Sequence, residues 1–157
     1  MSSNPQKDVT ALAEEFFLRE ICHRAGKPLS EGASIAVYPG EAPAITIRKS
    51  GSKLMAERAS PDNPDVSFWT PQGALEKLLA LQTEDIGQMG ILVIQLMASD
   101  KTEEHIRTRS HTGILDLMWK GYFGVLALGG PGLMKVLATR GFGNISRIKD
   151  AIHRMRS

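Results

Sequence analysis

The stretch DVSFWTPQGALEKLLAL (residues 65–81) changes its structural period at Pro71. Before Pro71, Val66 and Phe68 alternate with other residues and would share one face of a short β-strand. After it, leucines recur at helical spacing, and Thr70 and Pro71 are residue types favoured at the N-cap and first position of a helix. The stretch therefore predicts a strand followed by a helix over residues 70–81, with the helix packed on the sheet that contains the strand.

The residues before this stretch predict one helix and then three strands. Apolar residues recur at helical spacing from Asp8, which can cap a helix, to Gly26 and Pro28, which would end it. The segments ASIAVY (33–38) and AITIRKSGSKLMAERAS (44–60) then alternate in polarity, with a Ser-Gly-Ser turn at residues 50–52. We expect an antiparallel hairpin around this turn.

The residues after the stretch complete the expected fold. ILVIQLM (91–97) is apolar on both faces and predicts a buried inner strand, and a helical pattern runs from Lys101 towards the end. The expected fold class is α/β of the α+β type: a mostly antiparallel twisted sheet of about five strands, with helices on one face and a helical C-terminal extension. We expect one domain, with an N-terminal helix in residues 1–31, a core in 32–110 and the extension in 111–157.

Composition and charge indicate a folded protein with a basic C-terminal third. The 157 residues are 42% hydrophobic and 23% charged, with a single cysteine, which cannot form an internal disulfide. The polar N-terminal residues MSSNPQKDVT lack a secretory pattern, so we expect a cytoplasmic location. Residues 1–100 carry 9 basic and 13 acidic side chains (−4), and residues 101–157 carry 10 and 4 (+6), which together give the net charge of +2.

Catalytic and metal-binding patterns are weak in this sequence. The four histidines are scattered and have no cysteine cluster nearby, so we expect no metal and no cofactor. Cys22 and His23 are adjacent on a predicted helix and would point about 100° apart. Ser110 and His111 are adjacent too, and no G-x-S-x-G turn is present. We therefore predict that the protein is not an enzyme.

The order of elements and several residues resemble the sterol carrier protein type-two domain, a small α/β lipid-binding fold. In that family an Asp opens a strand, a Thr or Ser caps a leucine-rich helix, and a further strand follows a glycine. The resemblance covers residues 32–110, about half of the chain, and the positions that match are Asp65, Thr70, Leu75, Leu78, Leu79, Gly90 and the segment after Gly90. The sequence departs from the family pattern in two ways. The segment after Gly90 is almost entirely apolar, and nearly fifty further residues follow the matching region.

The stretch ILDLMWKGYFGVLALGGPGLM (114–134) is the most apolar part of the region beyond the resemblance. Asp116, Lys120 and the GGPG break make it a poor membrane span, and Pro131 removes an N–H donor that a phosphate-binding loop would need. We expect this stretch to cover an apolar cavity that has the sheet as its floor. Methionines at 89, 97, 118 and 134 would suit a cavity for variable aliphatic ligands, although core packing is the ordinary role of such residues.

The resemblance and the apolar stretch together predict binding, and transfer, of a fatty-acyl, sterol-like or other lipid in a cavity between sheet and helices. The alternative is a non-enzymatic protein-interaction module that uses its apolar face and a basic amphipathic helix in residues 142–157. We expect that helix to dock on the body, where residues 91–97 leave apolar surface to cover, and undocked it could contact an anionic membrane peripherally. Nucleic acid is not expected, because aromatic residues do not interleave its basic residues. The predicted ligand-binding residues are Phe68, Trp69, Leu75, Leu79, Ile91, Val93, Met97, Met118, Trp119, Tyr122, Phe123, Leu126 and Met134.

Overall fold

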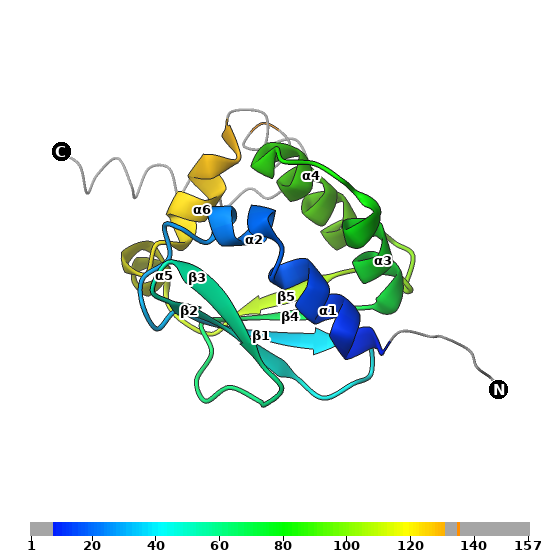
Figure 1. Ribbon diagram of the computed structural model, residues 1–157, viewed down its shortest axis with the longest axis horizontal. Helices are drawn as coiled ribbons and strands as arrows, with labels where there is room; N and C mark the ends of the chain where they lie inside the picture. The colour runs from blue at the N-terminus through cyan, green and yellow to red at the C-terminus, as the bar shows by residue number, and fades with distance from the viewer. Residues whose placement is uncertain (1–7, 131–134, 136–157) are drawn as a thin grey trace.

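A computed structural model of the chain describes residues 8–130 and residue 135. Its centre is a five-stranded mixed sheet with the strand order β3-β2-β1-β4-β5 (Figure 1). The strands are β1 (Ser34–Pro39), β2 (Ile45–Ser50), β3 (Lys53–Glu57), β4 (Val66–Thr70) and β5 (Arg107–Ser110). Neighbouring strands are antiparallel except β1 and β4, which are parallel. The predicted fold class, a mostly antiparallel sheet of about five strands with helices, is confirmed.

The predicted hairpin forms between β2 and β3. Ser50 pairs with Lys53, and Gly51 occupies the turn at a φ of 62°, a conformation that glycine adopts without strain. Residues 58–65 then return the chain to the start of β4. Ile45 and Ile47 face the helices, so Thr46 between them faces the other side of the sheet. The Thr46 hydroxyl donates a hydrogen bond to the Ala59 carbonyl at 2.7 Å. This connection therefore crosses the sheet on the face that the helices leave open.

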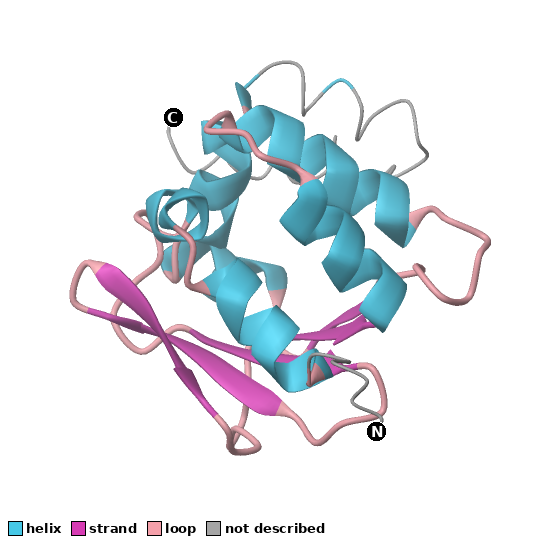
Figure 2. Cartoon of the chain, turned by 45° about the vertical axis from the view of Figure 1, so that its right-hand side comes forward, coloured by secondary structure: helices cyan, strands magenta, loops and turns pink. Residues whose placement is uncertain are grey.

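All six described helices lie on one side of the sheet (Figures 1 and 2). They are α1 (Val9–Phe17), α2 (Glu20–Ala25), α3 (Gln72–Ala80), α4 (Ile86–Met97), α5 (Ile114–Trp119) and α6 (Tyr122–Leu128). The described part of the C-terminal extension is helical as expected, and residues 136–157, with the predicted basic helix, lie outside the described residues. None of the helices in the described part is long and apolar enough to cross a bilayer.

The core consists of two clusters between the sheet and these helices. The first joins the inward residues of β1 and β2, such as Val37, Ile45 and Ile47, to Leu75 of α3. The second joins Phe16 of α1 to buried residues of α3 and α4, and Phe68 of β4 packs against it. The leucine pattern that predicted α3 thus marks the buried side of this helix, where Leu75 packs with the inward residues of β1 and β2 and Leu78 packs with α1 and α4.

The prediction of a strand at residues 91–97 was wrong, because ILVIQLM belongs to helix α4. A short run that is apolar on both faces fits a buried strand and a buried helix equally well. The local sequence favours the helix: the Asp85 carboxylate accepts a hydrogen bond from the Gly87 N–H at 2.8 Å and so caps its first turn. Gly87 and Gly90 lie inside the helix and do not form a connector before a strand.

Three further predictions of local structure were wrong. The fifth strand is β5, at residues expected to be helical, and it pairs with β4 from Val66 opposite Ser110 to Trp69 opposite Arg107. The first predicted helix is two helices, which are separated where Arg19 adopts extended backbone angles. Thr70 is the last residue of β4 and not a helix cap; Pro71 occupies the cap position and makes no side-chain cap bond.

Candidate functional site

Helix α4 carries no charged side chain among its twelve residues, IGQMGILVIQLM, and its two polar side chains, Gln88 and Gln95, are exposed. Met89, Ile94 and Leu96 are buried, whereas Ile91, Val93 and Met97 are only half-buried. Val93 and Met97 pack at the margin of the second core cluster, where Phe68 and Leu79 also lie. The fold therefore brings together four of the predicted ligand-binding residues, Phe68, Leu79, Val93 and Met97, with Ile91 on the same helix.

The first turn of α4 meets the end of α6 in close backbone contact. A Cβ atom added at Gly87 would lie 2.7 Å from the Gly129 carbonyl oxygen, closer than real Cβ contacts allow. Glycine at position 87 thus permits the segment after α6 to touch α4. In Figure 1, α6 and α4 form the upper part of the helical layer, away from the sheet.

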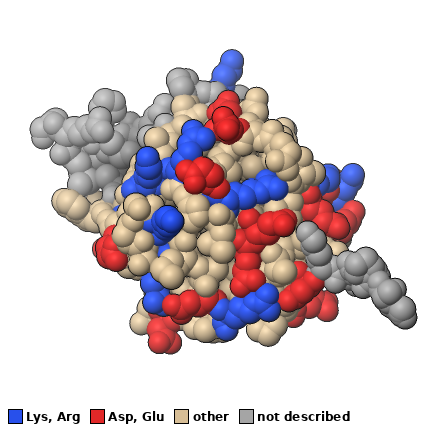
Figure 3. All heavy atoms as spheres, viewed as in Figure 1, with Lys and Arg blue, Asp and Glu red and all other residues tan. Residues whose placement is uncertain are grey.

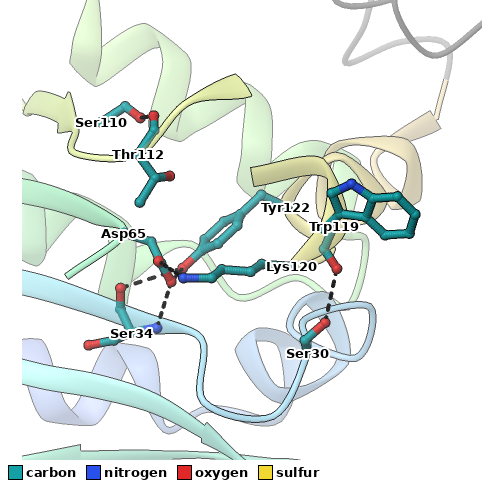
Figure 4. Close-up of polar contacts among 8 residues, drawn as sticks. All are labelled: Ser30, Ser34, Asp65, Ser110, Thr112, Trp119, Lys120 and Tyr122. Atoms are coloured by element: carbon teal, nitrogen blue, oxygen red, sulfur yellow. Dashed lines mark hydrogen bonds and ion pairs between the residues drawn. The ribbon is translucent and has the colours of Figure 1, made fainter. Parts of the chain in front are cut away.

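The other end of α6 is attached to the sheet through Asp65, which is only 1% exposed (Figure 4). One Asp65 carboxylate oxygen lies 2.5 Å from the Lys120 ammonium. The other accepts hydrogen bonds from the Tyr122 hydroxyl at 2.9 Å and the Ser34 backbone N–H at 3.0 Å. A buried carboxylate is tolerated only with such partners, so this group, which we call the Asp65 anchor, ties the start of α6 to β1 and β4.

The chemistry of the Asp65 anchor favours a structural role. Burial, a hydrogen bond to Asp65 and the charge of Asp65 all raise the pKa of the Tyr122 hydroxyl above its usual value. The neutral hydroxyl therefore remains a donor to Asp65 over the physiological pH range. Since both carboxylate oxygens already have partners within the fold, Asp65 is held as an anchor and is not presented to a ligand.

A second set of contacts fixes the turn between α5 and α6. The Ser30 backbone N–H donates to the Lys120 carbonyl at 2.8 Å, and the Ser30 hydroxyl donates to the Trp119 carbonyl at 3.2 Å. Gly121 follows at a φ of 90°, so close to the Pro28 carbonyl that any side chain there would overlap it. The Trp119 indole itself points away from the anchor and is 74% exposed (Figure 4).

Trp69 lies on the opposite face of the sheet from Phe68, because adjacent residues of a strand alternate between faces. Its ring stacks on Tyr38 with a centroid distance of 4.9 Å, and the Arg107 guanidinium lies 4.5 Å above it. On this face Ser67, which is 1% exposed, also bonds to His111 at 2.7 Å. The predicted ligand set is thus divided, with Trp69 on the outer face and Phe68 among the helices.

The remaining predicted ligand residues are spread over the helical layer. Leu75 is fully buried in the first core cluster, and Tyr122 packs at its margin. Met118 lies on α5, and Phe123 and Leu126 lie on α6, next to Trp119 and Tyr122 in sequence. Met134 lies outside the described residues.

A surface pocket of about 250 Å³ lies between α2 and the loop that joins α3 to α4. Most of its lining residues have polar or charged side chains, among them Arg19, Arg24, Gln82 and Glu84. The Arg19 guanidinium donates to carbonyls at the end of α3, the shortest bond being 2.7 Å to Leu79, and Arg24 donates to the Glu84 carbonyl at 2.8 Å. Arg19 therefore joins the start of α2 to α3, Arg24 joins α2 to the loop between α3 and α4, and the pocket lies in a different place from the predicted cavity.

The reactive groups considered in the sequence have structural partners. Burial raises the pKa of the Cys22 thiol to about 12, which makes the nucleophilic thiolate scarce. His23 accepts a hydrogen bond from the Leu54 N–H at 3.1 Å, and Ser110 donates to the Thr112 carbonyl at 2.9 Å, so neither forms the pair that its sequence neighbour suggests. Within the described residues, His, Cys, Asp and Glu form no group of three that could hold a metal ion.

The fold and the site define an α+β protein in which one helical layer carries a half-buried apolar helix and is fastened to the sheet by a buried ionic anchor. No protein-family model, curated protein or solved structure matches this chain. Sequence reasoning did not find the Asp65 anchor, although Asp65 itself was noted for the resemblance. Its partners are 55 and 57 residues away along the chain, and no local pattern marks such a pairing.

Proposed function

We propose that this protein binds, and transfers, a hydrophobic ligand of the fatty-acyl or sterol-like class against α4 in its helical layer. The observation that carries the proposal is the absence of any charged side chain in α4, whose Ile91, Val93 and Met97 remain half-buried. Gln88 and Gln95 form the exposed polar side of this helix, whereas apolar side chains beside it are normally covered. The proposed ligand supplies the missing cover, next to Phe68 and Leu79.

The mechanism in this proposal is burial without a chemical step. Each methylene group that leaves water contributes about 0.8 kcal/mol, so an acyl chain gains affinity without a specific polar contact. Burial raises the pKa of the Cys22 thiol, and His23 and Asp65 have partners within the fold, which supports carriage of a ligand over its conversion. The single cysteine fits a reducing compartment, and we propose the cytoplasm as the place of action.

The first test is native mass spectrometry of freshly purified protein, in which we expect a lipid to be retained. The second is titration with a fluorescent fatty acid, using Val93→Trp and Met97→Trp to fill the space beside α4. We expect these variants to weaken binding by about tenfold or more while stability changes little, since a ligand space accepts the added volume. Met55→Trp is the matched control, because Met55 is 53% exposed on the sheet's outer face.

Two results would reject the lipid proposal. One is a Val93→Trp protein that is destabilised by about 1 to 3 kcal/mol and binds the probe like the parent, which means that the side chains around α4 are packed tightly. The other is a parent protein with no retained lipid and no probe binding. In the second case, the half-buried face of α4 would favour the alternative role, a protein-interaction module.

A further inference from the structure

Two large apolar side chains on α5 remain exposed and lie one helical turn apart. Leu115 is 59% exposed and Trp119 is 74% exposed. Residues four positions apart share one face of a helix, so the two side chains form a continuous apolar surface. We call Leu115 and Trp119 the α5 pair.

The α5 pair is exposed in a fixed conformation, because the end of α5 is held by contacts and is not frayed. Immediately after Trp119 the chain is fixed by Ser30, which donates to two consecutive carbonyls, and by the Lys120–Asp65 ion pair. Gly121 then packs on the Pro28 carbonyl. With the backbone fixed on that side, Trp119 projects outward in a set direction (Figure 4).

We propose that the α5 pair inserts into the interfacial region of a phospholipid membrane. An indole ring suits this region because it combines a large apolar surface with one polar N–H group. Lys27 and Ser30 are exposed on the adjoining loop and suit headgroups, whereas the Lys120 ammonium is held by Asp65 and the nearby Asp116 is an exposed acid. This inference goes beyond the proposed function and does not depend on it.

A second copy of the chain or another protein fits the α5 pair less well. A stable protein–protein contact buries about 800 Å² on each partner, whereas one tryptophan contributes at most about 250 Å². Even with Leu115, the pair remains well below the area that a dimer needs. On the face shown in Figure 3, basic and acidic side chains are interspersed, so the described surface there presents no field of one sign, and apolar insertion is the main expected attraction.

The test is co-sedimentation of the full-length chain with vesicles of phosphatidylcholine alone and of phosphatidylcholine mixed with phosphatidylserine. We expect the parent to bind both kinds, and Leu115→Ser and Trp119→Ser to weaken binding by about tenfold or more. Met55→Ser is the matched control, because Met55 is an apolar side chain of similar exposure on β3, and it should bind like the parent. Thermal unfolding of all three variants should match that of the parent, since the substituted side chains are exposed.

Fluorescence reports on Trp119 itself in a Trp69→Phe background, where it is the remaining tryptophan. Vesicles should shift its emission to shorter wavelength. The proposal is overturned if Trp119→Ser binds vesicles like the parent, if the parent binds none, or if light scattering shows a dimer that Trp119→Ser abolishes. Probe binding by α4 is measured without vesicles, so failure of the membrane proposal and failure of the lipid-carrier proposal are separate results.

Discussion

The Asp65 anchor provides the sharpest test of how the C-terminal helices are held. Tyr122→Phe removes one donor to a buried carboxylate, at a distance of 2.9 Å. A hydrogen bond to a charged group contributes about 1.5 to 3 kcal/mol, and we expect the lower end because Lys120 and Ser34 still compensate the charge. Asp65→Asn removes the charge itself, and we expect a cost of about 3 kcal/mol. This is the lower end for breaking a buried ion pair, because the Lys120 side chain is 42% exposed and regains water.

The double variant Asp65→Asn/Tyr122→Phe separates the shared interaction from unrelated effects. Because both residues belong to one network, we expect the double variant to be less destabilised than the sum of the single variants, by about 1 kcal/mol. Urea unfolding followed by circular dichroism measures all four proteins. Asp62→Asn, which changes an exposed acid in the same loop, should stay within about 0.5 kcal/mol of the parent. Additive losses, or an Asp65→Asn protein as stable as the parent, would refute the anchor.

Two further predictions concern pH and close packing. Burial raises the pKa of Cys22 to about 12 and also raises the pKa of Tyr122, so both groups hold their protons more tightly in the folded state. Their contributions to stability are complete below the pKa values of the unfolded chain, about 8.5 for Cys22 and about 10 for Tyr122. These contributions are lost as pH rises through the folded-state pKa values. Unfolding free energies measured from about pH 8 to 11 should therefore fall less steeply for Cys22→Ala and Tyr122→Phe than for the parent, and parallel curves would contradict this. Gly121→Ala should cost about 2 kcal/mol or more, because its side chain would overlap Pro28 at a φ of 90°. Gly51 has a φ of 62°, and a Cβ atom added there would have no neighbouring atom within 4 Å, so Gly51→Ala should lower the free energy of unfolding by only about 1 kcal/mol. Equal losses of stability for the two substitutions would argue against close packing at Gly121.

The strands and helices that sequence predicts well are those with a one-sided pattern. In β1, β2 and β4 the inward residues alternate with outward ones, and in α3 the leucines recur at helical spacing against the sheet. These patterns arise because large apolar side chains face the helices while smaller or polar ones, such as Thr46 and Ser67, face the other side, and therefore they can be recognised locally.

The elements that sequence predicts poorly have no one-sided pattern. In α4 the run ILVIQLM is apolar at all positions but Gln95, so its period was ambiguous, and the residue that favours a helix is Asp85, which caps its first turn. Strand β5 is an edge strand whose residues Arg107 and Arg109 are exposed, and charged residues at an edge protect a sheet from further pairing. Its strand character depends on pairing with β4, about 40 residues earlier, which local propensity does not encode.

Residues 86–97 form a helix and not the predicted strand, and this difference decides which layer of the protein carries their apolar surface. A strand in this place would share its hydrogen bonds with the sheet and would direct its side chains to two faces only. Helix α4 satisfies its own backbone and directs Ile91 to one side of its axis and Val93 and Met97 to another, so their half-buried apolar surface belongs to the helical layer and not to the sheet. Within that layer α6 begins beside Trp119 at the Asp65 anchor, and the residue after it touches α4 at Gly87. If both proposals hold, a lipid that passes between a membrane at the α5 pair and the half-buried face of α4 would travel along α6, whose start is tied to Asp65 and whose following residue, Gly129, touches α4 at Gly87.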